Sequence, residues 1–281
     1  MRDGVAAGLS VGRMRGPAFA RPYRGIRSAC APQDEAERVL AFLPRLPERA
    51  FFCGPTAAVL WHLPLPPRMQ AGPVHVGVPA GERRLQAAGI AAHHLTLGSG
   101  DVVRHRGART TSVERTWCDL AAAGLSLAEL VAAGDRILWR RAPQSTHARL
   151  EAAVTVLHTR RGRRLLRAAL PLLSDRADSA PESEVRVAMH LDPRIPAPQV
   201  NEDLYAGGRF LARPDFSWPA QRVALEYEGD HHRTDREQWQ RDLERFSRMQ
   251  EAGWLCLRAS ARDYRRPARL LSQLLRVLAA R

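Results

Sequence analysis

Two apolar runs with the alternation of β-strands lie close together in the last third of the chain. The first spans residues 210–218 and carries Asp215, and the second spans residues 223–228 and carries Glu226 and Glu228. A turn that begins with proline separates them. Because successive side chains of a strand point to opposite faces, the two glutamates share a face. The pattern therefore predicts a hairpin that brings three carboxylates to one rim.

The segments around this hairpin have helical or strand spacing. A helix is predicted over residues 181–191, with Glu182 in its first turn. After the hairpin, the spacing predicts a helix over 234–252, a strand over 254–258 and a last helix to about residue 280. The predicted order from residue 181 onwards is α-β-β-β-α-β-α, an α/β arrangement with a mixed sheet flanked by helices.

The first half of the chain predicts an α+β region. Alternating runs at 74–78, 90–97 and 101–106 indicate a small antiparallel sheet. Helices are expected at 34–46, from Gly54 with Thr56 as its cap, at 113–120, from a capping box at Ser126, and at 145–158 and 162–173. Residues 1–33, with a short strand at 21–27, predict a poorly ordered arm. The polar run 174–180 predicts a boundary, which divides the chain into 1–33, 34–177 and 178–281.

Composition narrows the class of protein. The chain has 281 residues, of which 45% are hydrophobic, and charges interrupt every apolar stretch well before membrane-spanning length, so a cytoplasmic protein is expected. The four cysteines are scattered, which predicts reduced thiols and no zinc site. The net charge of +14 favours a polyanionic partner. All basic residues are arginine, a bias typical of a GC-rich genome, so local clusters such as residues 160–164 are better evidence.

The chemistry of the hairpin favours a divalent cation. Crowded carboxylates repel one another unless a cation lies among them, and hard oxygen ligands suit Mg²⁺ or Mn²⁺. The alternative is a set of surface acids at the end of an ordinary hairpin. His231 and His232 follow the second strand directly, where one ring can reach a phosphate or a water; surface histidines are the alternative. The other histidines, including His75, His93 and His94, have no partner at ligand spacing.

The residues from about Ser179 onwards resemble the PD-(D/E)XK nuclease superfamily. More narrowly, they resemble the bacterial domain family related to very-short-patch-repair endonucleases. The resemblance rests on Pro214-Asp-Phe, Leu225-Glu-Tyr-Glu-Gly-Asp-His-His-Arg233, Arg241-Asp-x-x-Arg245 and Gly253-Trp-x-x-Leu-Arg258. It implies a restriction-endonuclease-like core and a Mg²⁺-dependent endonuclease that cleaves DNA in repair or in phage and mobile-element defence, with RNA not excluded.

The resemblance also implies roles for individual residues. Catalytic roles fall on Asp215, Glu226, Glu228, His232 and Glu182. Asp215, Glu226 and the carbonyl of Tyr227 would hold the metal, and Arg233, Arg241, Arg245 and Arg248 would contact nucleic acid. Glu228 occupies the position where the superfamily usually carries lysine, and the chain has no lysine. This departure leaves open a second reading, in which the domain is a non-catalytic DNA-binding regulator.

The N-terminal half resembles the abortive-infection type IV antitoxin proteins. The matching marks are Gly54-x-Thr-Ala-Ala58, His75-Val, Thr111-Ser, Arg115-Thr-x-x-Asp-Leu120 and Asp135. Many of these relatives begin with a winged helix-turn-helix, for which the first segment of this chain is too short and too rich in glycine. The resemblance implies a possible toxin or defence partner.

Overall fold

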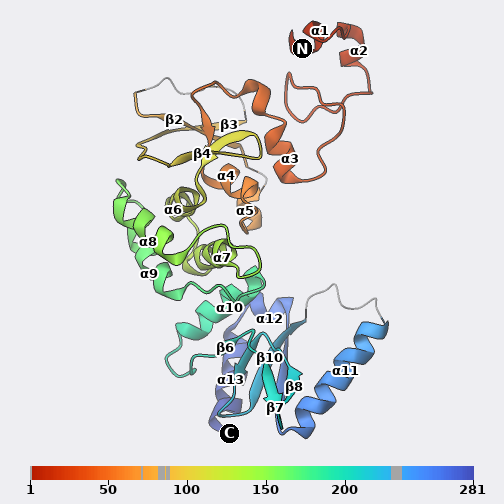
Figure 1. Ribbon diagram of the computed structural model, residues 1–281, viewed down its shortest axis with the longest axis vertical. Helices are drawn as coiled ribbons and strands as arrows, with labels where there is room; N and C mark the ends of the chain where they lie inside the picture. The colour runs from red at the N-terminus through yellow and green to blue at the C-terminus, as the bar shows by residue number, and fades with distance from the viewer. Residues whose placement is uncertain (1, 71, 82–85, 87–88, 229–235) are drawn as a thin grey trace. The chain divides into compact units, whose positions relative to one another are not determined.

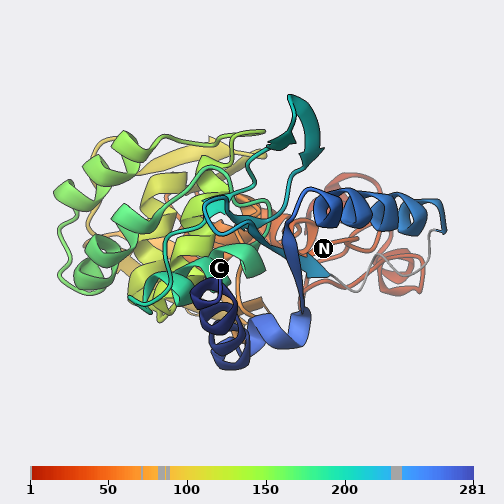
Figure 2. The ribbon, with the colours of Figure 1, turned by 90° about the horizontal axis from the view of Figure 1, so that it is seen from below.

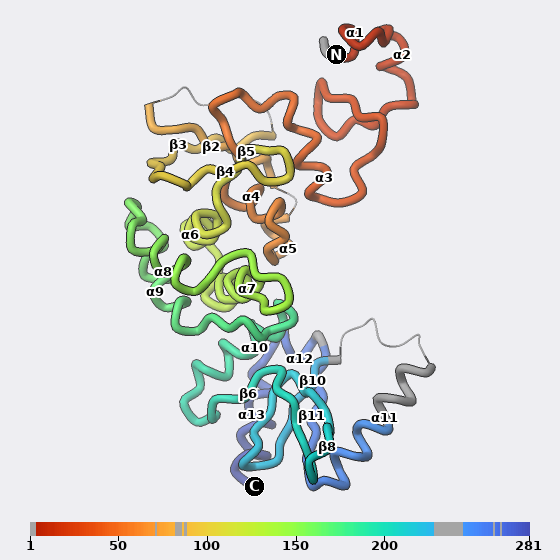
Figure 3. Tube along the Cα trace, in the orientation of Figure 1, coloured from red at the N-terminus to blue at the C-terminus, as the bar shows by residue number. Residues whose placement is uncertain are grey.

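The computed structural model describes residues 2–70, 72–81, 86, 89–228 and 236–281. Figure 3 traces the chain through them. The chain forms two compact units. Unit 1 contains residues 1–124 and 148–164, and unit 2 contains residues 125–147 and 165–281. The predicted boundary at 174–180 lies inside unit 2, together with the helix that follows Ser126. No helix in the described ranges is long and apolar enough to cross a membrane.

Unit 1 is built on a five-stranded mixed sheet with the order β3-β2-β1-β5-β4 (Figure 1). The strands are β1 (Phe51–Phe52), β2 (Val74–Pro79), β3 (Ile90–Leu95), β4 (Val102–His105) and β5 (Ala108–Thr111). The predicted antiparallel sheet is wrong, because β2 pairs with β3 and β1 pairs with β5 in parallel. Alternation of side chains is the same in both kinds of pairing, so it carries no information on direction.

The helices predicted for unit 1 begin close to their predicted positions. They are α3 (Glu35–Leu40), followed by the 3-10 helix η1 (Leu43–Arg45), α4 (Gly54–Leu60), α6 (Val113–Ala123) and α8 (His147–Val156), and α9 (Arg163–Ala169) starts here. The short helix α5 (Pro67–Gln70) was not predicted. The predicted cap of α4 is wrong. Cys53 is the N-cap residue, and the Thr56 hydroxyl instead accepts a hydrogen bond from the His75 backbone N–H at 2.8 Å.

The first 33 residues contain local structure where a poorly ordered arm was expected. Helices α1 (Arg2–Ala6) and α2 (Val11–Arg15) precede one isolated bridge between Ala20 and Ser28, in place of a strand at 21–27. Ile26 is buried in the core of unit 1, and the ring of Tyr23 meets Phe42 edge-on. Apolar contacts therefore fix the second half of this segment against the sheet.

Gly77 allows the central strands of unit 1 to pack closely, which gives a testable prediction. A Cβ atom at this position would overlap the ring of Phe51, which is fully buried and has no space to move. We expect Gly77→Ala to lower the free energy of unfolding by about 1–3 kcal/mol, the usual cost of overpacking a core. Urea denaturation measures the change. Gly12→Ala, where nothing lies within 4 Å of the added atom, is the matched control; equal midpoints for the two variants would contradict the prediction.

Unit 2 contains a four-stranded mixed sheet with the order β11-β10-β9-β6. Its strands are β6 (Gln199–Val200), β9 (Phe216–Trp218), β10 (Val223–Glu228) and β11 (Leu255–Ser260). Strands β7 (Leu204–Ala206) and β8 (Arg209–Ala212) form a separate hairpin whose end projects from the unit (Figure 2). At its base, Leu204, Leu211 and Ala212 pack with Ala224 of β10. The single strand predicted over 210–218 is therefore wrong. Pro214, which has no N–H for a sheet ladder, lies in the break between β8 and β9.

Helices cover both faces of the sheet in unit 2, as the predicted mixed sheet flanked by helices requires. They are α10 (Ala180–His190), α11 (Arg236–Glu251), α12 (Ala261–Arg265) and α13 (Ala268–Ala279), and α7 (Leu127–Leu138) packs on α10. Val223 and Leu225 pack with α10 and α13, whereas Ala224 packs with Met249 of α11. The predicted capping box of α7, between Ser126 and Glu129, is confirmed.

Candidate functional site

Asp215 and Glu226 lie on neighbouring strands of unit 2. Strands β9 and β10 are antiparallel, with Leu225 opposite Phe216 and Ala224 opposite Ser217. The same register continued by one residue sets Glu226 opposite Asp215, which directly precedes β9. The two residues are therefore neighbours across the strands. The carboxylate of Glu226 meets Arg245 of α11, whereas the neighbouring acid that affects Asp215 most is Glu182 of α10.

Glu226 forms an ion pair with α11. Its Oε2 atom lies 2.9 Å from an Nη atom of Arg245, and the two side chains are 11% and 30% exposed. The resemblance implied contact with nucleic acid for the arginines of α11, and the structure shows an ion pair with an acid for Arg245. A partly buried carboxylate is costly without a cation, so this pair offsets part of the cost of burying Glu226.

Asp215 is held against the backbone of β10 and experiences the charges of its neighbours. Its Oδ2 atom accepts a hydrogen bond from the Tyr227 N–H at 2.6 Å. Burial and the negative charges of Glu182 and Glu226 together raise the pKa of Asp215 to about 7, against the lowering effects of the Tyr227 N–H and Arg245. Asp215 thus lies close enough to both glutamates for their charges to repel its own. The third carboxylate predicted for the rim of the hairpin was that of Glu228, whose side chain lies outside the described structure.

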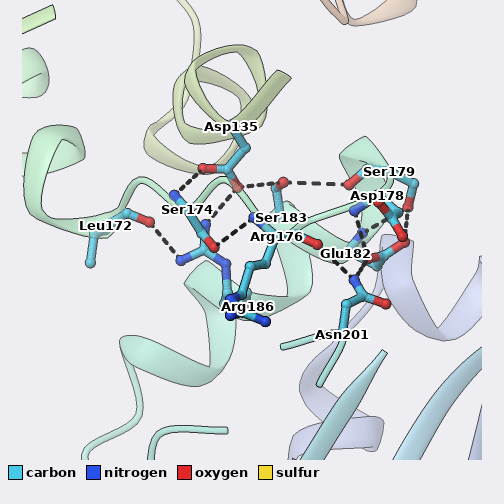
Figure 4. A network of polar contacts seen from close by, with 10 residues as sticks. All are labelled: Asp135, Leu172, Ser174, Arg176, Asp178, Ser179, Glu182, Ser183, Arg186 and Asn201. Carbon is cyan, nitrogen blue, oxygen red and sulfur yellow. Dashed lines mark hydrogen bonds and ion pairs between the residues drawn. The ribbon is translucent and has the colours of Figure 1, made fainter. Parts of the chain in front are cut away.

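Glu182 is occupied by hydrogen bonds at the start of α10 (Figure 4). Its carboxylate accepts from the Ser179 hydroxyl at 2.7 Å, the Asp178 N–H at 3.0 Å and the Asn201 side-chain amide at 2.8 Å. The backbone N–H of Asn201 in turn donates to the Asp215 carbonyl at 3.0 Å. Burial raises the pKa of Glu182 despite these donors. Glu182 therefore connects α10 to the chain segment that carries Asp215.

Tyr264 is a member of this site that the sequence did not reveal. Its ring stacks on Tyr227 with 4.5 Å between centroids and 26° between planes. Its hydroxyl is buried with no hydrogen-bond partner among the described residues. Burial raises the pKa of Tyr264, and the charges of Asp215 and Glu182 add to the effect. In the sequence, the signal for a role of Tyr264 in the site is its position directly after the strand β11.

Several predicted site residues are described only in part. Glu228 ends β10 and Arg241 lies in α11, but their side chains are outside the described structure, and His231, His232 and Arg233 are outside it entirely. Arg248 is described and exposed on α11. Within the described part of the chain, no group of three or more histidine, cysteine, aspartate or glutamate side chains is arranged to hold a metal ion. Of the predicted metal-binding acids, Asp215 and Glu226 are described.

A second polar cluster fastens α7 to α10 in unit 2 (Figure 4). Asp135 is 1% exposed. Its Oδ2 atom accepts from the Ser183 hydroxyl at 2.7 Å and from Arg186 at 2.6 Å, and its Oδ1 atom accepts from the Ser174 N–H at 2.7 Å. Arg186 also donates to the Leu172 carbonyl at 2.6 Å. This cluster holds α10, which carries Glu182, against α7.

Comparisons with known proteins find similarity to proteins of Mycobacterium tuberculosis over part of the chain. No protein-family model matches it. The uncharacterized proteins MT2308 and Rv2248 of two Mycobacterium tuberculosis strains are each 34% identical to it over 139 residues, which is 49% of this chain and 51% of each relative. The chain thus matches about half the length of these curated relatives. The crystal structure of the Rv2827c protein of M. tuberculosis aligns with this chain at a TM-score of 0.36 and 17% sequence identity. The alignment covers 74% of this chain and 78% of the Rv2827c chain.

Proposed function

We propose that unit 2 is a metal-dependent endonuclease that hydrolyses phosphodiester bonds in DNA, on a restriction-endonuclease-like core. The observation that supports this most is the closeness of Asp215, which directly precedes β9, to Glu226 of β10, whose charge acts on it. The order α10-β6-β9-β10-α11-β11-α12-α13, with the hairpin β7–β8 inserted after β6, resembles the predicted α-β-β-β-α-β-α core but adds the hairpin and α12. Repair and defence against phages or mobile elements are the proposed settings.

The acids of the site fit Mg²⁺ or Mn²⁺. A buried carboxyl whose pKa is raised to about 7 by burial and by two neighbouring acids is relieved when a cation binds beside it. Asp215, Glu226 and the carbonyl of Tyr227 would hold the ion, with Glu228 at the same end of β10. When bound, the ion supplies Lewis-acid polarisation of a phosphate oxygen and an acidified water. The Tyr227 N–H orients Asp215, and Asn201 fixes its backbone.

Arginines supply the positive charge that lysine gives in the superfamily. Arg245 balances Glu226, and Arg248 is exposed on the same helix. Guanidinium groups bind phosphate oxygens in a bidentate manner. DNA is the proposed substrate, and the same contacts suit RNA phosphates. A toxin or defence protein is the partner proposed for the N-terminal half, on its resemblance to antitoxins.

The direct test is nicking of supercoiled plasmid by the full chain. With Mg²⁺ or Mn²⁺ we expect open-circular DNA to form, and with EDTA we expect none. Asp192→Asn serves as a matched control, because Asp192 is in unit 2 and pairs only with Arg194 among the contacts described for it. It should cut like the wild type. The endonuclease proposal is contradicted if the plasmid stays supercoiled with either metal and if single-stranded and mismatched substrates also stay intact.

The second candidate is a DNA-binding regulator that keeps the fold without cutting. Two observations favour it: the guanidinium of Arg245 already neutralises Glu226, and the described residues contain no three-ligand metal cluster. A regulator would bind DNA with an affinity that falls steeply with salt, since phosphate contacts release counterions. Binding without metal-dependent cleavage of any substrate would support this candidate.

A variant of the Arg245–Glu226 pair distinguishes the endonuclease from the regulator without an assay of cleavage. In Arg245→Ala the carboxylate of Glu226 loses this cation, so a bound Mg²⁺ should compensate more than in the wild type. We therefore expect millimolar Mg²⁺ to raise the melting temperature of Arg245→Ala by several degrees more than that of the wild type. Arg248→Ala, on the same helix, should respond like the wild type. Equal responses of all three proteins would argue for the regulator.

A further inference from the structure

Unit 1 contains a cavity of about 560 Å³ that the proposed nuclease does not use. This volume is within the range of about 300–1,000 Å³ that is usual for small-molecule sites. The cavity lies between α5, strands β2 and β3, the C-terminal end of α6 and the loop before α9. Much of its lining is apolar, and the polar residues in it are few and of different kinds: His75, His93, Asp119, Arg68 and Arg161.

One wall of the cavity is acidic. Asp119 comes from the last turns of α6, and its Oδ1 atom accepts a hydrogen bond from Nε of Arg115 at 2.9 Å. Its Oδ2 atom is buried and has no hydrogen-bond partner within the described part of the chain. The carbonyl end of α6, where the helix dipole is negative, lies next to it at Ala122 and Ala123. Oδ2 itself is closed to solvent, but 13% of the Asp119 side chain is exposed, and the residue is part of the cavity lining. This wall therefore offers an acidic group to a ligand that brings an N–H group.

A second wall is a flat pair of imidazoles. Nδ1 of His75 lies 3.0 Å from Nε2 of His93, and the rings stack with 5.1 Å between centroids and 6° between planes. The pair exists because β2 and β3 are parallel neighbours, with His75 opposite Ala91 and Gly77 opposite His93. Burial and the charge of His93 lower the pKa of His75 to about 4, so the pair is not doubly charged at neutral pH. The sequence had indicated isolated histidines, and the structure corrects this.

The remaining polar groups of the cavity are the cations Arg68 and Arg161, which are both exposed. Arg68 donates to the carbonyl of Gly124, which caps α6, at 3.3 Å. Arg161 lies near the C-terminal end of α6 because its neighbour Gly162 packs closely against the backbone of that helix. A Cβ atom at Gly162 would lie 2.8 Å from the backbone of Ala121 and Ala122, and the φ of +79° also favours glycine. Two guanidinium groups in the lining of one cavity are suited to bind a phosphate.

We propose that this cavity binds a mononucleotide. The base would lie against the imidazole pair and the apolar lining, with its amino or ring N–H groups directed to Asp119. The phosphate would lie between Arg68 and Arg161. A planar ring with N–H donors at one end and an anion at the other matches the three kinds of polar group in the cavity. The proposal does not depend on the endonuclease, because every lining residue belongs to unit 1.

Calorimetric titration of the full chain tests the proposal with GMP, AMP and CMP, and with guanosine and ribose 5-phosphate as partial ligands. We expect at least one nucleotide to bind more tightly than both partial ligands. The double variant Arg68→Ala/Arg161→Ala should weaken nucleotide binding at least tenfold and leave the affinity for guanosine unchanged. His93→Ala should weaken both.

Two controls locate the binding. Arg104→Ala changes an exposed arginine of β4 that is not part of the cavity lining, and Arg248→Ala removes an arginine of the candidate nuclease site. Both should bind the nucleotide as the wild type does. The proposal is overturned if no nucleotide binds, if the double variant binds as tightly as the wild type, or if Arg248→Ala alone removes the binding.

Discussion

Asp215→Asn should reduce metal-dependent nicking of plasmid by at least about 100-fold and, in the absence of metal, should make the protein more stable. The loss of cleavage follows because an amide is a poor ligand for Mg²⁺ and cannot carry the charge that the ion balances. DNA binding should be equal or slightly tighter, since a negative charge beside the phosphate is removed. Gel shift in EDTA and nicking in Mg²⁺ measure the two effects on the same preparation.

The gain in stability follows from the pKa of Asp215. The folded protein raises this pKa from its ordinary 3.8 to about 7. Between these values the folded state binds more protons than the unfolded state, so this carboxyl makes stability fall as pH rises from about 4 to about 7. Asparagine does not ionise and can still accept from the Tyr227 N–H. The variant should therefore match the wild type below pH 4 and exceed it above pH 7 by on the order of a few kcal/mol.

Urea denaturation at pH 5 and pH 8 in EDTA tests this sign. Asp192→Asn is a control with the opposite electrostatics, because hydrogen bonds from Arg194 lower the pKa of Asp192. It should not gain stability at pH 8. Mg²⁺ should then raise the midpoint of the wild type and leave Asp215→Asn unchanged. If Asp215→Asn is less stable than the wild type at pH 8, Asp215 is a structural residue and the metal site fails with it.

Asp135→Ala should lower the free energy of unfolding by about 3–5 kcal/mol, the usual cost of leaving a buried partner charge uncompensated. Arg186 is 13% exposed at its side chain and would keep its charge with one partner fewer, while the Ser174 N–H and the Ser183 hydroxyl would each lose an acceptor. Because α10 carries Glu182, the candidate active site should lose activity at temperatures where the variant is still mostly folded.

The control for this prediction is an exposed ion pair in the same unit. Arg141, 57% exposed, pairs with Asp178 at 3.1 Å. Solvent screens such a pair, so Arg141→Ala should cost less than about 1 kcal/mol. Urea denaturation of both variants at pH 7 gives the comparison. Similar losses for Asp135→Ala and Arg141→Ala would show that the buried cluster contributes no more than a surface pair.

The sequence alone determined the features that depend on local periodicity. Alternation along residues 223–228 separates Val223 and Leu225 from Ala224 and Glu226, and the structure places these sets against different helices. The capping box at Ser126 and a mixed sheet flanked by helices were likewise predictable. Each of these depends on residues two to four positions apart, which the linear sequence shows directly.

Tertiary structure alone decided which distant groups meet. Glu182 was predicted as an aid to the metal, but Asn201, 19 residues away, and the Ser179 cap take up its carboxylate. The stacking of Tyr264 on Tyr227 and the pairing of His75 with His93 depend on which strands and helices become neighbours. Alternation fixes the face of a strand on which a side chain lies, but the partner strand and its direction are set by packing between segments far apart in sequence.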